Sequence, residues 1–322
     1  MVNILKIQIQ FFSLCVYCLL SLNNVCYSQQ SIQPTVIASI KPYYNLIAAV
    51  TGQIFSPQLL ITGNASPHNY TLKPSEIQQL QKANIILWGG CAGEPFLTKV
   101  LKQLHKTTLV FDVSQLPNIK KLPIRTTANW AHNKHCHHSN TKHTFHKPFD
   151  PHIWLSIQNA NIIVYTITNT LSKMDPIHEP EYRTNASLFL EKLHNLDQQL
   201  KHRLQNILDK PYLVFHDAYQ YFETHFQLNP ISAITINPEA PPSAKKIYQI
   251  QQLLKKKQVA CIFSEPQFPQ KTINNLLAGT QVIHDVLDPL GQDSDLGPIG
   301  YITLLETLAN HLQTCLEQSL YS

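Results

Sequence analysis

Short apolar runs alternate with longer segments of helical periodicity along most of the chain. The first half contains four such runs, at residues 36–40, 58–61, 85–88 and 108–113. The second half contains four more, at residues 212–215, 231–236, 259–263 and 281–286. Strands that alternate with helices are typical of parallel sheets covered by helices on both faces. The pattern therefore predicts an α/β protein with two similar lobes, each built on a four-stranded, mainly parallel sheet.

A long region of helical pattern separates the two lobes. One helix is expected over residues 157–172 and a second over residues 179–208, where leucines recur at helical spacing. A continuous helix of roughly 30 residues would be about 45 Å long and would form a stiff connector. We therefore expect an N-terminal lobe at residues 34–172, a connecting helix at 173–210 and a C-terminal lobe at 211–322.

The N-terminus has the pattern of an export signal. Lys6 precedes an apolar stretch at residues 7–22, and a small-residue cleavage pattern follows at residues 26–28. The stretch is short for a membrane span, and an uncleaved membrane anchor is the alternative. We expect residues 1–28 to be a cleaved signal peptide and the mature protein to be exported.

Histidine is the unusual feature of the composition. The chain of 322 residues contains 16 histidines, whereas its net charge of +5 is too small to indicate nucleic-acid binding. Imidazole is the commonest transition-metal ligand among the side chains. Residues 130–147 have no hydrophobic periodicity and are expected to form a histidine-rich loop. Six histidines lie in this segment: His132, His135, His137, His138, His143 and His146.

Three further histidines and an aspartate follow predicted strands or adjoining loops. His68 and His152 belong to the first lobe, and His216 and Asp288 belong to the second. Ligands of parallel α/β sheets bind at the carboxyl ends of the strands. Zinc accepts imidazole nitrogen and carboxylate oxygen, usually from four ligands. The distribution favours a metal ion held between the lobes, although each histidine taken singly could be a structural group and Asp288 a turn residue.

The mature chain would retain four cysteines in an oxidising compartment, where disulfides persist. Cys261 ends an apolar strand-like run, and Cys315 lies in a helical pattern near the C-terminus. A bridge between them would connect the last helix to the second sheet. The sequence alone does not determine the pairing, and two buried free thiols are the alternative.

Six stretches resemble the zinc-binding receptors of bacterial ABC importers, the ZnuA type. In chain order they are SPHNYTLKPS at residues 66–75, PHIWLS at 151–156, FHDAYQYFE at 215–223, NPE at 237–239, FSEPQF at 263–268 and LDPLG at 287–291. Because they run in order through nearly all of the mature chain, the resemblance is specific.

The resemblance implies a periplasmic receptor that captures Zn²⁺ and delivers it to an ABC-type membrane permease. It implies that His68, His152 and His216 are the three imidazole ligands. Cys261 and Cys315 match a disulfide of some members, and the histidine-rich loop matches an accessory metal-binding segment of the zinc members. We expect a monomer without enzymatic activity.

The fourth ligand is where the chain departs from the family. Several zinc receptors have an acidic residue directly before the first ligand, and here that residue is Pro67. Water, Asp288 or a loop histidine could complete the site, and Asp288 matches the carboxylate ligand of manganese and iron relatives. Glu239 and Glu265 could fix the ligand histidines by accepting hydrogen bonds from their outer nitrogens. Capping or salt-bridge roles are the alternative for both glutamates.

Two other functions are compatible with three histidines. A manganese or iron receptor of the same fold is one, although those metals favour more oxygen ligands. A zinc hydrolase is the other, since three histidines with an open position also build catalytic zinc sites. The chain lacks the His-Glu-x-x-His pattern on a helix, and its histidines come from separate lobes. Both features favour the zinc receptor.

Overall fold

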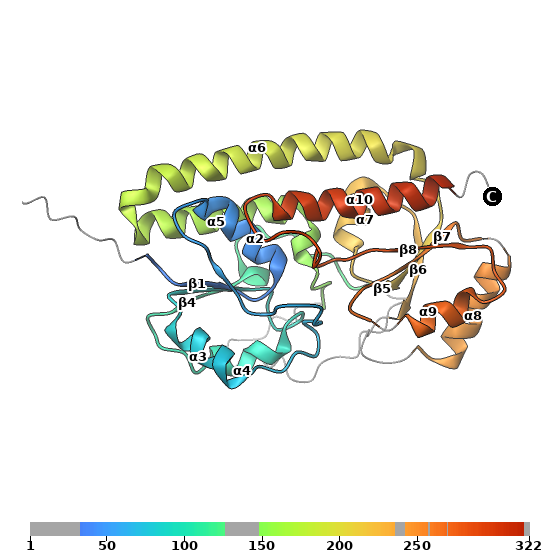
Figure 1. Ribbon diagram of the computed structural model, residues 1–322, viewed down its shortest axis with the longest axis horizontal. Helices are drawn as coiled ribbons and strands as arrows, with labels where there is room; N and C mark the ends of the chain where they lie inside the picture. The colour runs from blue at the N-terminus through green and yellow to red at the C-terminus, as the bar shows by residue number, and fades with distance from the viewer. Residues whose placement is uncertain (1–32, 126–147, 236–241, 257, 269, 319–322) are drawn as a thin grey trace, which may run out of the picture. The chain divides into compact units, whose positions relative to one another are not determined.

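Two four-stranded parallel sheets form the framework of the protein (Figure 1). The computed structural model describes residues 33–125, 148–235, 242–256, 258–268 and 270–318. The first sheet has the order β2-β1-β3-β4. Its strands are β1 (Val36–Ala38), β2 (Gln58–Leu59), β3 (Ile85–Trp88) and β4 (Leu109–Asp112). All pairings in this sheet are parallel.

The second sheet repeats this topology with the order β6-β5-β7-β8. Its strands are β5 (Tyr212–His216), β6 (Pro230–Thr235), β7 (Cys261–Ser264) and β8 (Ile283–Val286). These pairings are parallel as well. The predicted α/β class with two four-stranded parallel sheets is therefore confirmed, and every strand begins and ends within two residues of its predicted run.

The central strands β3 and β5 are buried along their whole length because both faces of each sheet are covered. In β3, Ile85 and Leu87 pack into one cluster of buried side chains, whereas Ile86 packs into another on the opposite face. Val214 and Leu213 of β5 are divided between two faces in the same way. Successive side chains of a strand point to opposite faces, so a continuous apolar run is the expected signal of a doubly covered sheet.

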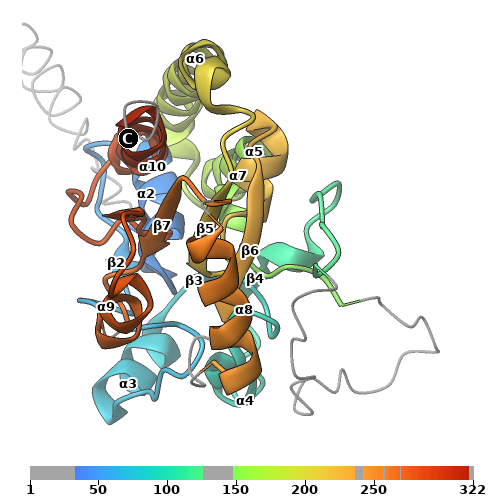
Figure 2. The same cartoon turned by 90° about the vertical axis from the view of Figure 1, so that its right-hand side faces the viewer.

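Helices on the outer faces are short and lie over one sheet each. The first sheet carries α3 (Pro74–Lys82) and α4 (Thr98–Leu101), and the second carries α8 (Ala244–Lys255) and α9 (Lys271–Leu277). Figure 2 shows these four helices on the same side of the two sheets. Leu80 of α3 and Ile250 of α8 are fully buried against the strands.

The opposite faces share one layer of helices. This layer contains α2 (Lys41–Thr51), α5 (Ile157–Met174), α6 (Glu179–Arg203), α7 (Gln220–Phe226) and α10 (Gly300–Gln318). In both views α6 and α10 lie side by side, and they contact each other (Figures 1 and 2). A single buried cluster contains residues of this layer together with strand residues of both sheets. The two lobes therefore share one hydrophobic core.

The connecting helix is confirmed but is shorter than its leucine pattern indicates. α6 ends at Arg203, and the chain continues as a 3₁₀ helix over Leu204–Ile207. Tightening of the last turn is a common way to satisfy backbone groups at a helix end. Leu204 and Ile207 remain fully buried, so the hydrophobic pattern persists after the α-helical geometry has ended.

The predicted disulfide between Cys261 and Cys315 is present. It links β7 to α10, which also contacts α2 in the first lobe. Cys91 is disulfide-bonded too. Among the residues that the structure describes, no helix combines the length and the apolar character that a membrane span requires.

Several predictions fall on parts of the chain outside the described residues. They concern the signal peptide at 1–28, the whole histidine-rich loop at 130–147 with its six histidines, and Glu239. These stay predictions, as do the proposed domain boundaries.

Candidate metal centre

His216 and Glu265 lie where the strand order of the second sheet changes direction. β5 is flanked by β6 on one side and by β7 on the other. The connections therefore leave the carboxyl ends of β5 and β7 in opposite directions, and a space opens between them. His216 is the last residue of β5, and Glu265 directly follows β7. His216 Nδ1 lies 3.2 Å from each carboxylate oxygen of Glu265.

His152 is oriented by the aspartate two residues before it. Asp150 Oδ1 accepts one hydrogen bond from the His152 backbone N–H at 2.9 Å and another from Nδ1 at 2.7 Å. The Trp154 ring packs against the imidazole with the ring centroids 5.1 Å apart. Trp154 Nε1 in turn donates to the backbone oxygen of Pro289, which belongs to the second lobe. The His152 ring is therefore held by contacts to both lobes.

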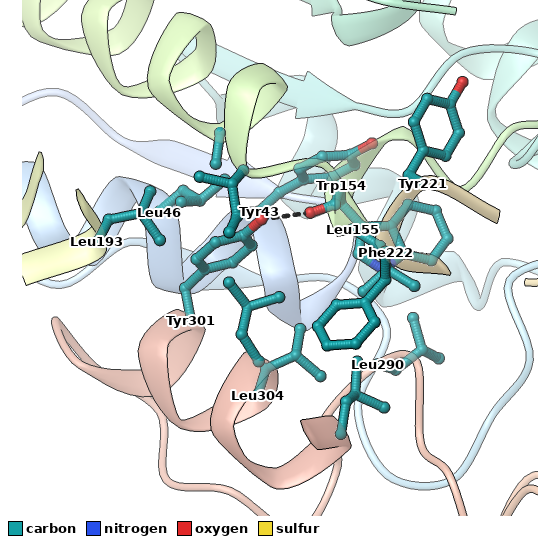
Figure 3. Packing of buried hydrophobic residues seen from close by; sticks show 14 of the residues in the cluster. Tyr43, Leu46, Trp154, Leu155, Leu193, Tyr221, Phe222, Leu290, Tyr301 and Leu304 are labelled. Carbon is teal, nitrogen blue, oxygen red and sulfur yellow. Dashed lines mark hydrogen bonds between the residues drawn. The ribbon is translucent and has the colours of Figure 1, made fainter. Parts of the chain in front are cut away.

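The core behind Trp154 is built from large side chains of several helices. Figure 3 shows Tyr43, Trp154, Phe222 and Tyr301 converging there, with the hydrogen bond from the Tyr301 hydroxyl to the Trp154 backbone oxygen. Tyr43 belongs to α2, Phe222 to α7 and Tyr301 to α10. Packing from three helices leaves the Trp154 segment little freedom to move.

His68 comes from the loop between β2 and α3. Its backbone N–H donates to Ser66 Oγ at 3.3 Å. The end of this loop is held by Glu76, which accepts a 2.8 Å hydrogen bond from the Tyr70 hydroxyl and caps the start of α3. The His68 ring is half-buried, so it is the most accessible of the three candidate ligands.

The structure brings the three predicted ligand histidines together. One nitrogen from each of His68, His152 and His216 can be chosen so that all three lie within 4.8 Å of one another. Tetrahedral zinc with bonds of about 2.0–2.1 Å needs nitrogens about 3.4 Å apart, so the three nitrogens would have to move closer together to bind it. Because carboxylates engage Nδ1 of His152 and of His216, Nε2 is the nitrogen of each ring that could bind a metal.

The cavity beside the histidines has the size of a single ion. Its volume is about 10 Å³, close to the space of one water-sized sphere. Pro67 and Leu290 line it, as do Phe268 and Gln267. The three imidazoles together with a small cavity fit one desolvated transition-metal ion.

The three histidines differ in their protonation. Burial lowers the pKa of His68 and of His152 well below the usual value, and the neighbouring imidazoles lower both further. Burial also acts to lower the pKa of His216, but the Glu265 carboxylate outweighs it and the net shift is upward. His68 and His152 are thus kept neutral, which is the form that binds metal.

Asp288 does not belong to the group of three histidines whose nitrogens lie within 4.8 Å of one another. Its Oδ1 accepts hydrogen bonds from Gln267 Nε2 at 2.7 Å and from the Leu290 backbone N–H at 2.9 Å. Its Oδ2 accepts from the Gln292 backbone N–H. These bonds make Asp288 the organiser of the turn after β8, the role that its position before Pro289 also suggests. The assignment of Asp288 as a ligand stays a prediction that its hydrogen bonds disfavour.

Sequence reasoning missed the charged residues behind the histidines. Burial raises the pKa of Asp150 and of Glu223 to about 7 each, while the positive charge of Arg125 lowers both. The Asp-Pro-His order at residues 150–152 was a local signal, since an aspartate readily accepts from backbone two residues on. Arg125 and Glu223 are 98 residues apart, so no local pattern could pair them.

Comparison with known proteins identifies relatives that match most of the chain. The family model of the periplasmic zinc-uptake complex component A (ZnuA) matches residues 36–315. The high-affinity zinc uptake system protein ZnuA of Brucella suis is 35% identical over 306 residues, which cover 88% of this chain and 92% of the relative. The protein of the same description from Yersinia pestis is 33% identical over 290 residues, covering 88% and 91%. A crystal structure of ZnuA matches with a TM-score of 0.74 at 25% identity, covering 88% of this chain and 98% of that one.

Proposed function

Because the chain belongs to the ZnuA family of periplasmic zinc-uptake components, we propose that it captures zinc at His68, His152 and His216 and hands the ion to an ABC-type permease. The observation that carries this proposal is the convergence of three imidazoles from both lobes on a cavity of about 10 Å³. A site closed by two lobes can hold an ion tightly, and it can release the ion when a partner alters their contact. The relatives support a periplasmic location, and a monomer suffices because all three histidines belong to one chain.

Zinc titration against a competing chelator tests the ligand assignment. The wild-type protein is expected to have one tight zinc site. His68→Ala and His216→Ala should each weaken it by more than the roughly 100-fold that loss of an outer hydrogen-bond partner costs. His311→Ala is the matched control, because His311 also pairs with a carboxylate but lies on α10. Full affinity in both ligand variants would refute the assignment.

For the fourth coordination position we favour water or a histidine of the loop, with Asp288 as the alternative. Pro67 offers no ligand atom, and Asp288 is engaged by backbone. Zinc binds three imidazoles and a water without a carboxylate. If Asp288→Asn lowered zinc affinity as much as His216→Ala, Asp288 would have to be counted as a ligand.

The histidine-rich loop is proposed as an accessory collector of zinc. Its six imidazoles would raise the local metal concentration, and a higher effective concentration favours transfer to the tight site. Deletion of residues 130–147 should remove weak zinc equivalents from the titration and leave the tight site. Loss of the tight site on deletion would mean that a loop histidine is the fourth ligand.

The rival functions receive less support from the geometry. Manganese and iron favour oxygen-rich sites, whereas the grouped ligands are imidazoles. A hydrolase needs space for its substrate beside the metal, and this cavity has room for about one water. Zinc-dependent turnover of an ester, peptide or phosphate substrate would revive the enzymatic interpretation.

A further inference from the structure

Arg125 lies at the boundary between the lobes, close to the candidate ligands. It is the last described residue before the segment that contains the histidine-rich loop. Its Nη1 forms an ion pair with Asp217 Oδ1 at 3.1 Å, and its Nη2 pairs with Glu223 Oε2. The side chains of Asp217 and Glu223 are 5% and 2% exposed, whereas that of Arg125 is 26% exposed. One guanidinium of the first lobe thus joins two buried carboxylates of the second.

Backbone contacts hold the Arg125 segment against the second lobe. The Leu122 backbone N–H donates to the Tyr221 hydroxyl at 3.0 Å, and that hydroxyl donates to the Asp150 backbone oxygen at 2.9 Å. The Asp150 backbone N–H donates to the Leu122 oxygen at 2.9 Å. The two chain segments that precede and follow the histidine-rich loop therefore lie together against α7.

Two of the three carboxylates near Arg125, Asp217 and Asp150, are each linked to a different ligand histidine. Asp217 directly follows His216 in the chain. Asp150 accepts hydrogen bonds from both the backbone and the ring of His152, and the charge of Arg125 acts on Asp150 as well. Arg125 is therefore connected to His152 of the first lobe through Asp150 and to His216 of the second lobe through Asp217.

We propose that Arg125 is a positioning residue for metal capture, which sets the distance between His152 and His216 by joining the chain segments that carry them. This inference rests on the proposed function and adds a residue that would act on the ligands through neighbouring carboxylates. Without the cation, the ion pairs with Asp217 and Glu223 would be lost, and no charged contact would hold the two segments together. The planar guanidinium binds two carboxylates at once, which the single ammonium of lysine does less well.

Substitution of Arg125 tests the proposal through zinc affinity and ligand geometry. Arg125→Met should bind zinc 10- to 100-fold more weakly, the range typical of outer partners of metal ligands, and Arg125→Lys should fall between Arg125→Met and wild type. The absorption spectrum of bound Co²⁺ reports the coordination geometry and should change in Arg125→Met. Arg203→Met is the control, because Arg203 contacts Asn310 and Gln313 on α10, and its zinc affinity should match wild type.

A second variant separates positioning from stability. In Arg125→Met combined with Glu223→Gln, the buried Glu223 charge is removed together with its cation, so thermal stability should rise above that of Arg125→Met while zinc affinity and the Co²⁺ spectrum remain altered. Recovery of wild-type zinc affinity in this double variant would overturn the proposal and leave Arg125 a stabilising role alone. Wild-type zinc affinity and spectrum in Arg125→Met would overturn it as well. Failure of the wild-type protein to bind zinc would instead refute the proposed function.

Discussion

At the scale of single residues, the three candidate ligands differ chiefly in their carboxylate partners. His216 faces Glu265, which makes its pKa higher than usual, while burial lowers the pKa of His68 and His152. The proton and the zinc ion compete for the same imidazoles. His216 is therefore the ligand that protonates first as the pH falls.

We predict that zinc affinity falls as the pH drops through the raised pKa of His216, and that Glu265→Gln moves this fall to lower pH. The glutamine removes the negative charge that favours imidazolium, so the proton competes less well with zinc. Chelator competition between about pH 5 and pH 8 measures the profile. His311→Ala should keep the wild-type profile, and an unshifted profile in Glu265→Gln would contradict the prediction.

The buried carboxyl group of Glu94 should make the free energy of unfolding depend on pH even without bound metal. Glu94 is 1% exposed and accepts a 3.0 Å hydrogen bond from the Gly89 backbone N–H, and burial raises its pKa from 4.5 to about 8. The folded protein thus holds this proton more tightly than the unfolded chain. The stability that it contributes is complete below about pH 4.5 and is lost as the pH rises through about 8.

Glu94→Gln should abolish this part of the pH dependence. The free energy of unfolding of the variant should gain on that of wild type as the pH rises from about 5 to 9, by on the order of a few kcal/mol. Urea unfolding of the apoprotein at several pH values measures the difference. Glu191→Gln, on the exposed side of α6, is the control, and parallel stability profiles for Glu94→Gln and wild type would count against the raised pKa.

At the scale of secondary-structure elements, α10 is the helix that unites the lobes at the C-terminal end. It contacts α2 and α6, and it is bonded to β7 through Cys261 and Cys315. The Tyr301 hydroxyl adds a hydrogen bond to the backbone of Trp154 in the first lobe. This helix therefore supports the Trp154 segment against which His152 packs.

Removal of the Cys261–Cys315 bridge should destabilise the fold without abolishing zinc binding. The bridge spans a sequence separation of 54, for which chain entropy predicts a stabilisation of about 4 kcal/mol. The double variant Cys261→Ala, Cys315→Ala is preferable to chemical reduction, because Cys91 is disulfide-bonded too. Guanidinium unfolding gives the stability change, and chelator competition at low temperature should return wild-type zinc affinity for the fraction that is folded.

At the scale of the whole molecule, the described residues from Gln33 onward form one compact unit. The shared hydrophobic cluster includes residues of both sheets. Polar contacts also cross between the lobes, such as that of Lys41 Nζ with the Gln292 backbone oxygen at 2.7 Å. Neither lobe buries all of its apolar surface without the other.

The protein should consequently unfold in a single transition. Circular dichroism and tryptophan fluorescence are expected to give coincident urea unfolding curves for the apoprotein. Saturating zinc should move both curves together, by about 4 kcal/mol when free zinc is roughly 1,000 times the dissociation constant. Two separate transitions, one of them insensitive to zinc, would show that the lobes fold independently.

The sequence by itself determined the strands, the class of fold and the three histidines that meet. Parallel strands buried on both faces leave continuous apolar runs, and side chains just after such runs must gather at one edge of each sheet. These are local signals, readable without knowledge of distant residues. The Cys261–Cys315 pairing was an expectation of the family resemblance and needed the structure to establish it.

Beyond Glu265, which the sequence suggested, only the tertiary structure decided which residues support the histidines. Asp288 is engaged by the turn after β8, and Arg125 by Asp217 and Glu223. α10, expected only to connect to the second sheet, also packs on the first lobe. These contacts join residues far apart in the chain. Burial shifts the pKa values of the charged groups at the site. Neither the distance between remote residues nor the loss of their hydration is encoded in a local pattern of side chains.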